Sequence, residues 1–152
     1  MSNPADVSSI DAIINAAYDV ISGPAGKKRD WDRERSLFLP GARLIPTAME
    51  AGENRSSLVP QFLDVEGYIA RVKPYFAENG FYEKEVARRT EQVGRIAHVW
   101  STYESRHRAD DAEPFMRGIN SIQLFYDGTR WWIVNIYWQH ESADDPIPAK
   151  YL

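Results

Sequence analysis

Two adjacent residues at the end of an aromatic segment could carry out proton-transfer chemistry. The segment YDGTRWWIVNIYWQHE runs from Tyr126 to Glu141 and ends in a histidine beside a carboxylate. His140 could act as a general base, because imidazole titrates near neutral pH. Neighbouring residues on a strand point to opposite sides, so Glu141 is not automatically its partner. An exposed strand end is the alternative interpretation of both residues.

Tyrosine, serine and amide side chains supply the other polar candidates. Tyr18 lies in an apolar helical pattern and could donate to a ligand oxygen; the alternative is a core tyrosine with its hydroxyl at the rim. Tyr103, Ser121 and Gln123 fall on strand faces that otherwise carry apolar residues. Buried polar groups need partners, so these three bond to one another, to water or to a ligand. Polar groups that converge in an apolar cavity are typical of a small-molecule site.

Composition argues against several other kinds of site. The chain of 152 residues has no cysteine, which excludes disulfides, thiolate metal ligands and a cysteine nucleophile. The three histidines, His98, His107 and His140, lack the spacing of a metal site, so we expect neither a metal nor a cofactor. A net charge of -4 disfavours nucleic-acid binding. With no signal peptide and no apolar run near the ~20 residues of a membrane span, we expect a cytoplasmic protein.

Helices occupy the first half of the chain and would position Tyr18. Apolar residues recur at helical spacing over residues 10–21, and a second, short helix starts at Asp30. A third helix covers residues 65–79, with Pro74 expected to kink or restart it. The mixed charges of GKKRDWDRER predict a solvated helix face with ion pairs.

Strands fill the second half and would position the remaining candidates. Short strands are predicted at residues 42–46 and 58–63. The polar loop that joins them is expected to be a plain surface loop; the alternative is a lid that brings Glu50 or Glu53 near a ligand. Alternating charges place EKEVARRTEQ at an exposed sheet edge. Helices followed by an antiparallel meander indicate one α+β domain over residues 1–152. Four long strands follow the helices, at residues 81–92, 95–107, 114–126 and 130–140.

Strand alternation divides the sheet residues between two faces. The final two strands pair across Asp127-Gly128, a strong hairpin signal, with a register uncertain by one residue. The face predicted to line the core carries Val99, Tyr103, Ile119, Ser121, Gln123, Val134, Ile136 and Trp138. Large apolar residues also fall on the other face, and an exposed patch of this kind predicts a homodimer interface. Its members are Trp100, Trp131, Ile133 and Tyr137.

The order of these motifs resembles the nuclear transport factor 2-like superfamily, which includes ketosteroid isomerase and the SnoaL-like polyketide cyclases. The resemblance rests on NAAYDVIS, DWDRERSLFLPGARLIP, IAHVWSTYE and DGTRWWIVNIYW, and extends from about Ile10 to His140. It implies a cystatin-like α+β roll. In such a roll the N-terminal helices wrap a bent antiparallel sheet into a cone with a central pocket, and the protein is commonly dimeric.

Residue by residue, the resemblance implies a pocket but not the isomerase reaction. Tyr18 matches the oxyanion-hole tyrosine of ketosteroid isomerase, and Trp138 matches a pocket tryptophan of that enzyme. The position of its carboxylate base holds Pro46, and its second oxyanion donor matches Ser121, or Asn120 if the register slips. Without a base within reach, steroid isomerisation by that route is not expected.

Two functions follow as hypotheses. The first is binding of a small, apolar, oxygen-bearing organic ligand, with isomerase, cyclase or dehydratase chemistry carried by Tyr18, Tyr103 and His140. Its ligand-binding residues are Trp138, Ile136, Val134, Ser121, Asn120, Gln123, Ile119 and Val99. The alternative is a non-catalytic binding or interaction module whose cone is filled by Trp132, Trp138 and Phe125. The cavity volume distinguishes the two hypotheses.

Overall fold

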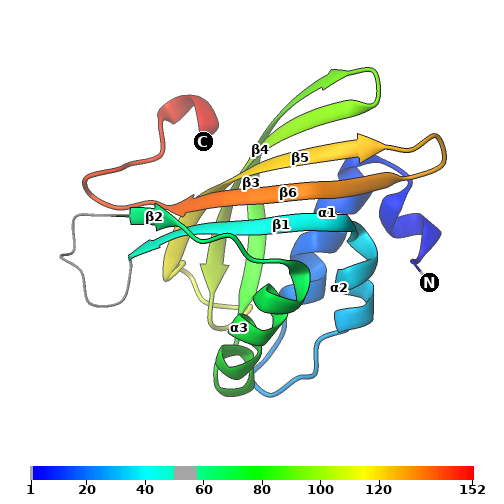
Figure 1. Ribbon diagram of the computed structural model, residues 1–152. Helices are drawn as coiled ribbons and strands as arrows, with labels where there is room; N and C mark the ends of the chain where they lie inside the picture. The colour runs from blue at the N-terminus through cyan, green and yellow to red at the C-terminus, as the bar shows by residue number, and fades with distance from the viewer. Residues whose placement is uncertain (1, 50–57) are drawn as a thin grey trace.

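The computed structural model describes residues 2–49 and 58–152, which form three α-helices and one six-stranded sheet (Figure 1). The helices are α1 (Ile10–Ile21), α2 (Trp31–Leu37) and α3 (Val65–Glu78), with single 3-10 turns η1 (Pro4–Val7) and η2 (Ala149–Tyr151) near the termini. The strands are β1 (Phe38–Met49), β2 (Leu58–Pro60), β3 (Tyr82–Val93), β4 (Ile96–Arg106), β5 (Met116–Tyr126) and β6 (Trp131–His140). The predicted α+β class is confirmed.

The strands lie in the order β2-β1-β6-β5-β4-β3. All neighbours are antiparallel except β1 and β6, which run parallel. The meander β3 to β6 was expected from the sequence, and β3 does form an edge. The parallel pair was not, because β1 and β6 lie far apart in the chain and their pairing leaves no local signal.

Each helix begins at a residue whose side chain caps it. Ser9 accepts a hydrogen bond from the Ala12 amide at 3.0 Å at the start of α1. Asp30 caps α2 and Asp64 caps α3 in the same way. Such caps satisfy amide groups that have no partner inside the helix. Pro74 lies inside α3 and does not end it.

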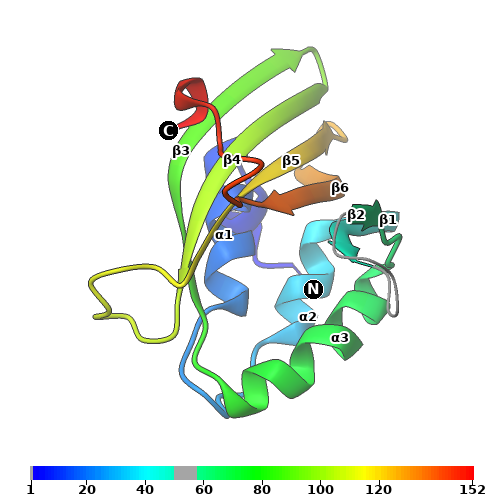
Figure 2. The same cartoon turned by 90° about the vertical axis from the view of Figure 1, so that its left-hand side faces the viewer.

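The sheet is strongly curved, and the helices lie on its concave side (Figure 2). Register shifts occur in the β1–β6, β3–β4 and β5–β6 pairs. Bulges of this kind bend a strand and increase its twist. The C-terminal tail lies on the convex side, where Tyr151 contacts Trp100 at a ring-centroid distance of 5.4 Å (Figure 1).

One bulge on β6 corrects the predicted faces. Near the hairpin Phe125 pairs with Trp132, as expected, but Gln123 pairs with Asn135 and Val134 is the extra residue. Beyond the bulge every partner is displaced by one position. Ile136 and Trp138 therefore face inward opposite Ile122 and Asn120, whereas the predicted core face paired them with Ser121 and Ile119.

Two residues of the predicted outer patch are buried in the core instead. Trp131 and Ile133 are only 8% and 0% exposed and belong to the core with Ile122 and Leu124. Trp100 and Tyr137 remain on the outer face. We define the inner face by Asn120, Ile122, Ile136 and Trp138, and the outer face by Trp100, Ile119, Ser121, Gln123 and Tyr137.

The charged segment before and within α2 is not a fully solvated face, contrary to expectation. Arg29 is 3% exposed, and its guanidinium donates to the carbonyl oxygens of Ile21, Gly23, Pro24 and Lys27. The predicted loop with Glu50 and Glu53 lies outside the described residues. Of the helices in the described ranges, none is long and apolar enough to cross a membrane.

Candidate functional site

A cavity of about 280 Å³ lies between the inner face of the sheet and the helices. Its apolar walls include Ile122, Ile136 and Trp138. Neither Trp132 nor Phe125 lines it, so those two rings do not fill the cone. Its polar lining comes from every layer of the fold: Tyr18 of α1, Glu34 of α2, Tyr68, Arg71 and Tyr75 of α3, Glu83 of β3, Tyr103 of β4, Asn120 of β5 and His140 of β6.

Six of the candidate residues from the sequence meet in this cavity. They are Tyr18, Tyr103, Asn120, Ile136, Trp138 and His140. Asn120 lies opposite Trp138, and Gly118 lies opposite His140 on the neighbouring strand. The missing side chain at Gly118 matters, because a Cβ there would lie 2.4 Å from the Tyr103 hydroxyl oxygen. The glycine thus leaves room for the Tyr103 ring in the cavity wall.

The other five candidates do not line the cavity. Val99 is fully buried in the core, and Val134 is the bulge residue. Gln123 is exposed and accepts from the side-chain amide of Asn135 at 2.8 Å. Ile119 and Ser121 lie on the outer face, where Ser121 bonds to His98 at 2.9 Å. The bulge at Val134 explains why Asn120, and not Ser121, lies on the inner face with Trp138.

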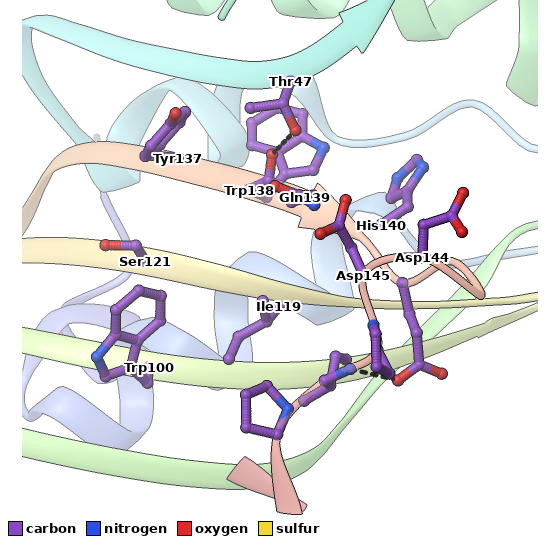
Figure 3. A pocket seen from close by; sticks show the side chains of 14 residues that line it. Thr47, Trp100, Ile119, Ser121, Tyr137, Trp138, Gln139, His140, Asp144 and Asp145 are labelled. Carbon is purple, nitrogen blue, oxygen red and sulfur yellow. Dashed lines mark hydrogen bonds between the residues drawn. The ribbon is translucent and has the colours of Figure 1, made fainter. Parts of the chain in front are cut away.

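Ile119 and Ser121 line an outer pocket of about 360 Å³ beneath the C-terminal tail, which Trp138 and His140 border as well (Figure 3). Trp100 and Tyr137 form its floor, and the segment 144–148 forms its rim. Glu141 anchors that segment by accepting from the Ile147 amide at 2.8 Å. The carboxyls and tyrosines whose pKa values burial raises strongly all line the inner cavity, which is therefore the better candidate site.

Hydrogen-bond directions limit what Tyr18 can do. Glu85 is ion-paired with Arg88 and accepts a hydrogen bond from the Ser101 hydroxyl. The Ser101 oxygen can then only accept from the Tyr18 hydroxyl, at 2.6 Å. The Asn120 amide donates in turn to the Tyr18 oxygen at 2.9 Å. The proton of Tyr18 is thus directed away from the cavity, and its expected role as a donor to a ligand is not available in this arrangement.

Burial also keeps Tyr18 neutral. Loss of solvent contact raises the pKa of its hydroxyl far above the ordinary value, and the nearby Glu83 raises it further. The hydrogen bonds of Tyr18 with Ser101 and Asn120 act in the opposite direction but do not offset this effect. Tyr18 therefore holds the Asn120 side chain in place within the cavity wall.

Glu34 is the functional candidate that the sequence interpretation missed. It is 3% exposed, and its Oε2 atom has no hydrogen-bond partner among the described residues. Burial raises the pKa of its carboxyl to about 8, so at pH 7 it is mainly a neutral acid. The available signal was helical spacing: Glu34 lies three residues from both Trp31 and Leu37, which are buried.

A second acid and two tyrosines line the same cavity. Glu83 accepts from the Ser105 hydroxyl at 3.1 Å, and burial raises the pKa of its carboxyl to about 8. Tyr68 packs edge-on against Trp138, with ring centroids 6.2 Å apart. Burial raises the pKa of Tyr68, and the neighbouring Glu34 and Glu83 raise it further. The hydroxyls of Tyr68 and Tyr103 therefore remain protonated at neutral pH.

His140 lies exposed at the mouth of the cavity. Partial burial lowers the pKa of its imidazole, and the charge of Arg71 lowers it further, so the ring is neutral at pH 7. Glu141 points elsewhere and pairs with Arg117 at 2.8 Å. The described residues contain no group of three or more histidine or acidic side chains placed to hold a metal ion.

No protein-family model and no curated protein sequence matches the chain, but solved structures do. An NTF2-like protein of unknown function from Pseudomonas putida is 10% identical, with a TM-score of 0.62 over 96% of this chain and 95% of that one. A protein with a cystatin-like fold from Caulobacter vibrioides is 12% identical, with a TM-score of 0.63 over 90% of each chain. The yeast UBP3-associated protein BRE5 is 12% identical, with a TM-score of 0.60 over 87% of this chain and 93% of that one.

These similarities define the class of the fold. The chain has the nuclear transport factor 2-like fold, as the sequence resemblance implied. At 10–15% identity the similarities show the fold alone. Function has to be argued from the cavity, because one fold serves many activities.

Proposed function

We propose that the cavity binds a small, largely apolar organic molecule with one oxygen-bearing end. The main observation behind this proposal is the buried Glu34 carboxyl. It lines the largely apolar cavity, and its Oε2 atom has no hydrogen-bond partner among the described residues. A few polar groups within apolar walls are the usual composition of a ligand site. Asn120 and Tyr103 would orient the oxygen, while Ile136 and Trp138 would contact the apolar body.

The enzymatic form of this proposal is proton transfer on the bound molecule. Isomerase, cyclase and dehydratase reactions all move protons between carbon and oxygen. Glu34 is a neutral acid and His140 a neutral base at pH 7, so the cavity offers both partners of such a transfer. Tyr18 would act by positioning Asn120, and Tyr103 by donating to the substrate oxygen.

The alternative, a non-catalytic module with a filled cone, has less support. It requires Trp132 and Phe125 to occupy the interior. Trp132 instead lies at the hairpin end, where its indole donates to Asp127 at 2.8 Å and stacks beneath Arg130. A cavity of about 280 Å³ lies where the filling rings were expected.

Binding of hydrophobic oxygenated probes tests the proposal. We expect 2-indanol and 2-tetralone to bind the wild-type protein in calorimetry and to alter its tryptophan fluorescence. Trp138→Ala should weaken binding at least tenfold, because it removes the largest apolar wall. Trp132→Phe is the matched control and should leave the affinity unchanged. Equal affinities of wild type and Trp138→Ala would contradict the assignment of the cavity.

We also propose that a second copy of the chain covers the outer face. At the end of the C-terminal tail, Tyr151 contacts Trp100 on β4. Tyr137 on β6 is 42% exposed and lies beside Ile119 in the outer pocket. An apolar sheet face of this kind is normally covered by a partner. An isologous dimer would cover the same patch on both copies.

A further inference from the structure

The charges of the cavity are distributed unevenly. Glu34 and Glu83 line its interior, and both carboxyls are shielded from solvent enough to raise their pKa values. Among the described lining residues Arg71 is the only arginine or lysine. It is exposed, and its guanidinium donates to Gln61 at 2.5 Å, outside the cavity. The interior thus contains two acids and no cation.

Aromatic rings surround this acidic interior. Tyr68 and Trp138 meet edge-on in the wall, and Tyr18 and Tyr103 approach each other with ring centroids 6.3 Å apart. Aromatic faces attract cations, most strongly where water is excluded. An acid without a partner inside aromatic walls is complementary to an organic ammonium group.

We infer that the molecule bound in this cavity carries a protonated amine, which pairs with the carboxylate of Glu34. This inference rests on the proposed function and adds a basic nitrogen to the ligand. An ammonium group would supply the missing partner of the Glu34 oxygen. A buried carboxylate is costly when alone and is stabilised when it gains a paired, hydrogen-bonded cation. A neutral ligand offers no such partner, and with it Glu34 would keep its proton.

Binding of an ammonium ligand is linked to the ionisation of the Glu34 carboxyl. The pKa of Glu34 in the empty cavity is about 8, so at pH 7 the carboxyl holds about nine tenths of a proton. An ammonium ligand requires the ionised form and therefore expels that proton on binding. Affinity should rise about tenfold per pH unit up to about pH 8 and then level off. A neutral ligand that accepts a hydrogen bond from the acid would show the opposite sign.

Other titratable groups face the same space and must be separated from Glu34. From the packed elements these are Glu83, Tyr18, Tyr68, Tyr75 and Tyr103, with Arg71 and His140 at the mouth. Burial raises the pKa values of the four tyrosines, which therefore keep their protons throughout the range from pH 6 to 8. Only Glu83 and His140 could imitate the linkage. Their replacement by glutamine provides the two control variants.

The experiment compares 2-aminoindane with 2-indanol, which share one shape and differ in the ammonium group. Calorimetry at pH 7 in phosphate and in Tris measures protons released, since the two buffers have different ionisation enthalpies. We expect about nine tenths of a proton for the amine and none for the alcohol. Glu34→Gln should abolish the release and weaken amine binding at least tenfold, with alcohol binding changed less than twofold. Glu83→Gln and His140→Gln should retain the release.

Three other outcomes would overturn the amine, the role of Glu34 or the proposed function. If the alcohol binds as tightly as the amine and no proton is released, the amine inference is overturned and the proposed function stands. If proton release survives in Glu34→Gln, the assignment to Glu34 is overturned. If neither probe binds the wild-type protein, the proposed function fails and the inference fails with it.

Discussion

Replacing Glu34 by glutamine should make the protein more stable at high pH. Glutamine has nearly the same shape as glutamic acid but cannot ionise. Glu34 is 3% exposed, and burial raises its pKa from 4.5 to about 8. The folded protein therefore keeps a proton that the unfolded chain releases in this interval. The protonated Glu34 carboxyl therefore makes its whole contribution to the free energy of unfolding below pH 4.5. This contribution is lost as the pH rises to about 8.

The size of the effect follows from the pKa shift. Each pKa unit corresponds to about 1.4 kcal/mol, so the interval from 4.5 to about 8 corresponds to roughly 5 kcal/mol in the free energy of unfolding. All other titratable groups are common to wild type and variant and cancel in the difference. The variant should match the wild type within about 1 kcal/mol at pH 5 and exceed it by several kcal/mol at pH 9.

Urea denaturation followed by circular dichroism at pH 5, 7 and 9 measures this difference. Glu66→Gln is the matched control, because Glu66 is exposed and its hydrogen bond with Arg35 lowers rather than raises its pKa. The control should gain no stability as the pH rises. A difference between wild type and Glu34→Gln that stays constant with pH would refute the reasoning, since it would show that Glu34 titrates normally in the folded state.

Three further variants test the cavity wall and the outer face. Gly118→Ala would place a Cβ 2.4 Å from the Tyr103 hydroxyl and should lower the free energy of unfolding by about 1–3 kcal/mol in urea denaturation; unchanged stability would show that this ring moves freely. Tyr18→Phe leaves the buried Asn120 amide without its acceptor and should cost about 1–3 kcal/mol in the same assay, whereas a neutral result would show that the amide finds another partner. Tyr137→Asp should convert a dimer to a monomer in sedimentation experiments, and a monomeric wild type or an unaffected dimer would contradict the outer-face interface.

The sequence was sufficient for the fold because its signals are local and numerous. Caps such as Ser9 and Asp30, and the Asp127-Gly128 hairpin, each mark an element boundary within a few residues. The parallel pairing of β1 with β6 has no such signal, since its partners are about ninety residues apart in the chain. The bulge at Val134 also lacked a signal, because valine is a normal strand residue.

That bulge shows why the site was harder to predict than the fold. Strand alternation has a period of two, so one extra residue transfers every following residue to the other face. Trp138 and His140 were placed correctly inside because both lie beyond the bulge on β6 itself. Their predicted partners on β5 were wrong by one position, so that Asn120 rather than Ile119 lies opposite Trp138.

The buried acid was missed for a different reason. A glutamate within a run of charged residues is normally solvated, and only its spacing from Trp31 and Leu37 indicates burial. A carboxyl in this position costs the folded protein stability above pH 4.5 and finds no compensating partner for its Oε2 atom among the described residues. Groups with such unfavourable environments concentrate at functional sites. Because the Tyr18 proton is directed toward Ser101, the chemistry of the cavity depends on Glu34 rather than on the tyrosine that the resemblance pointed to.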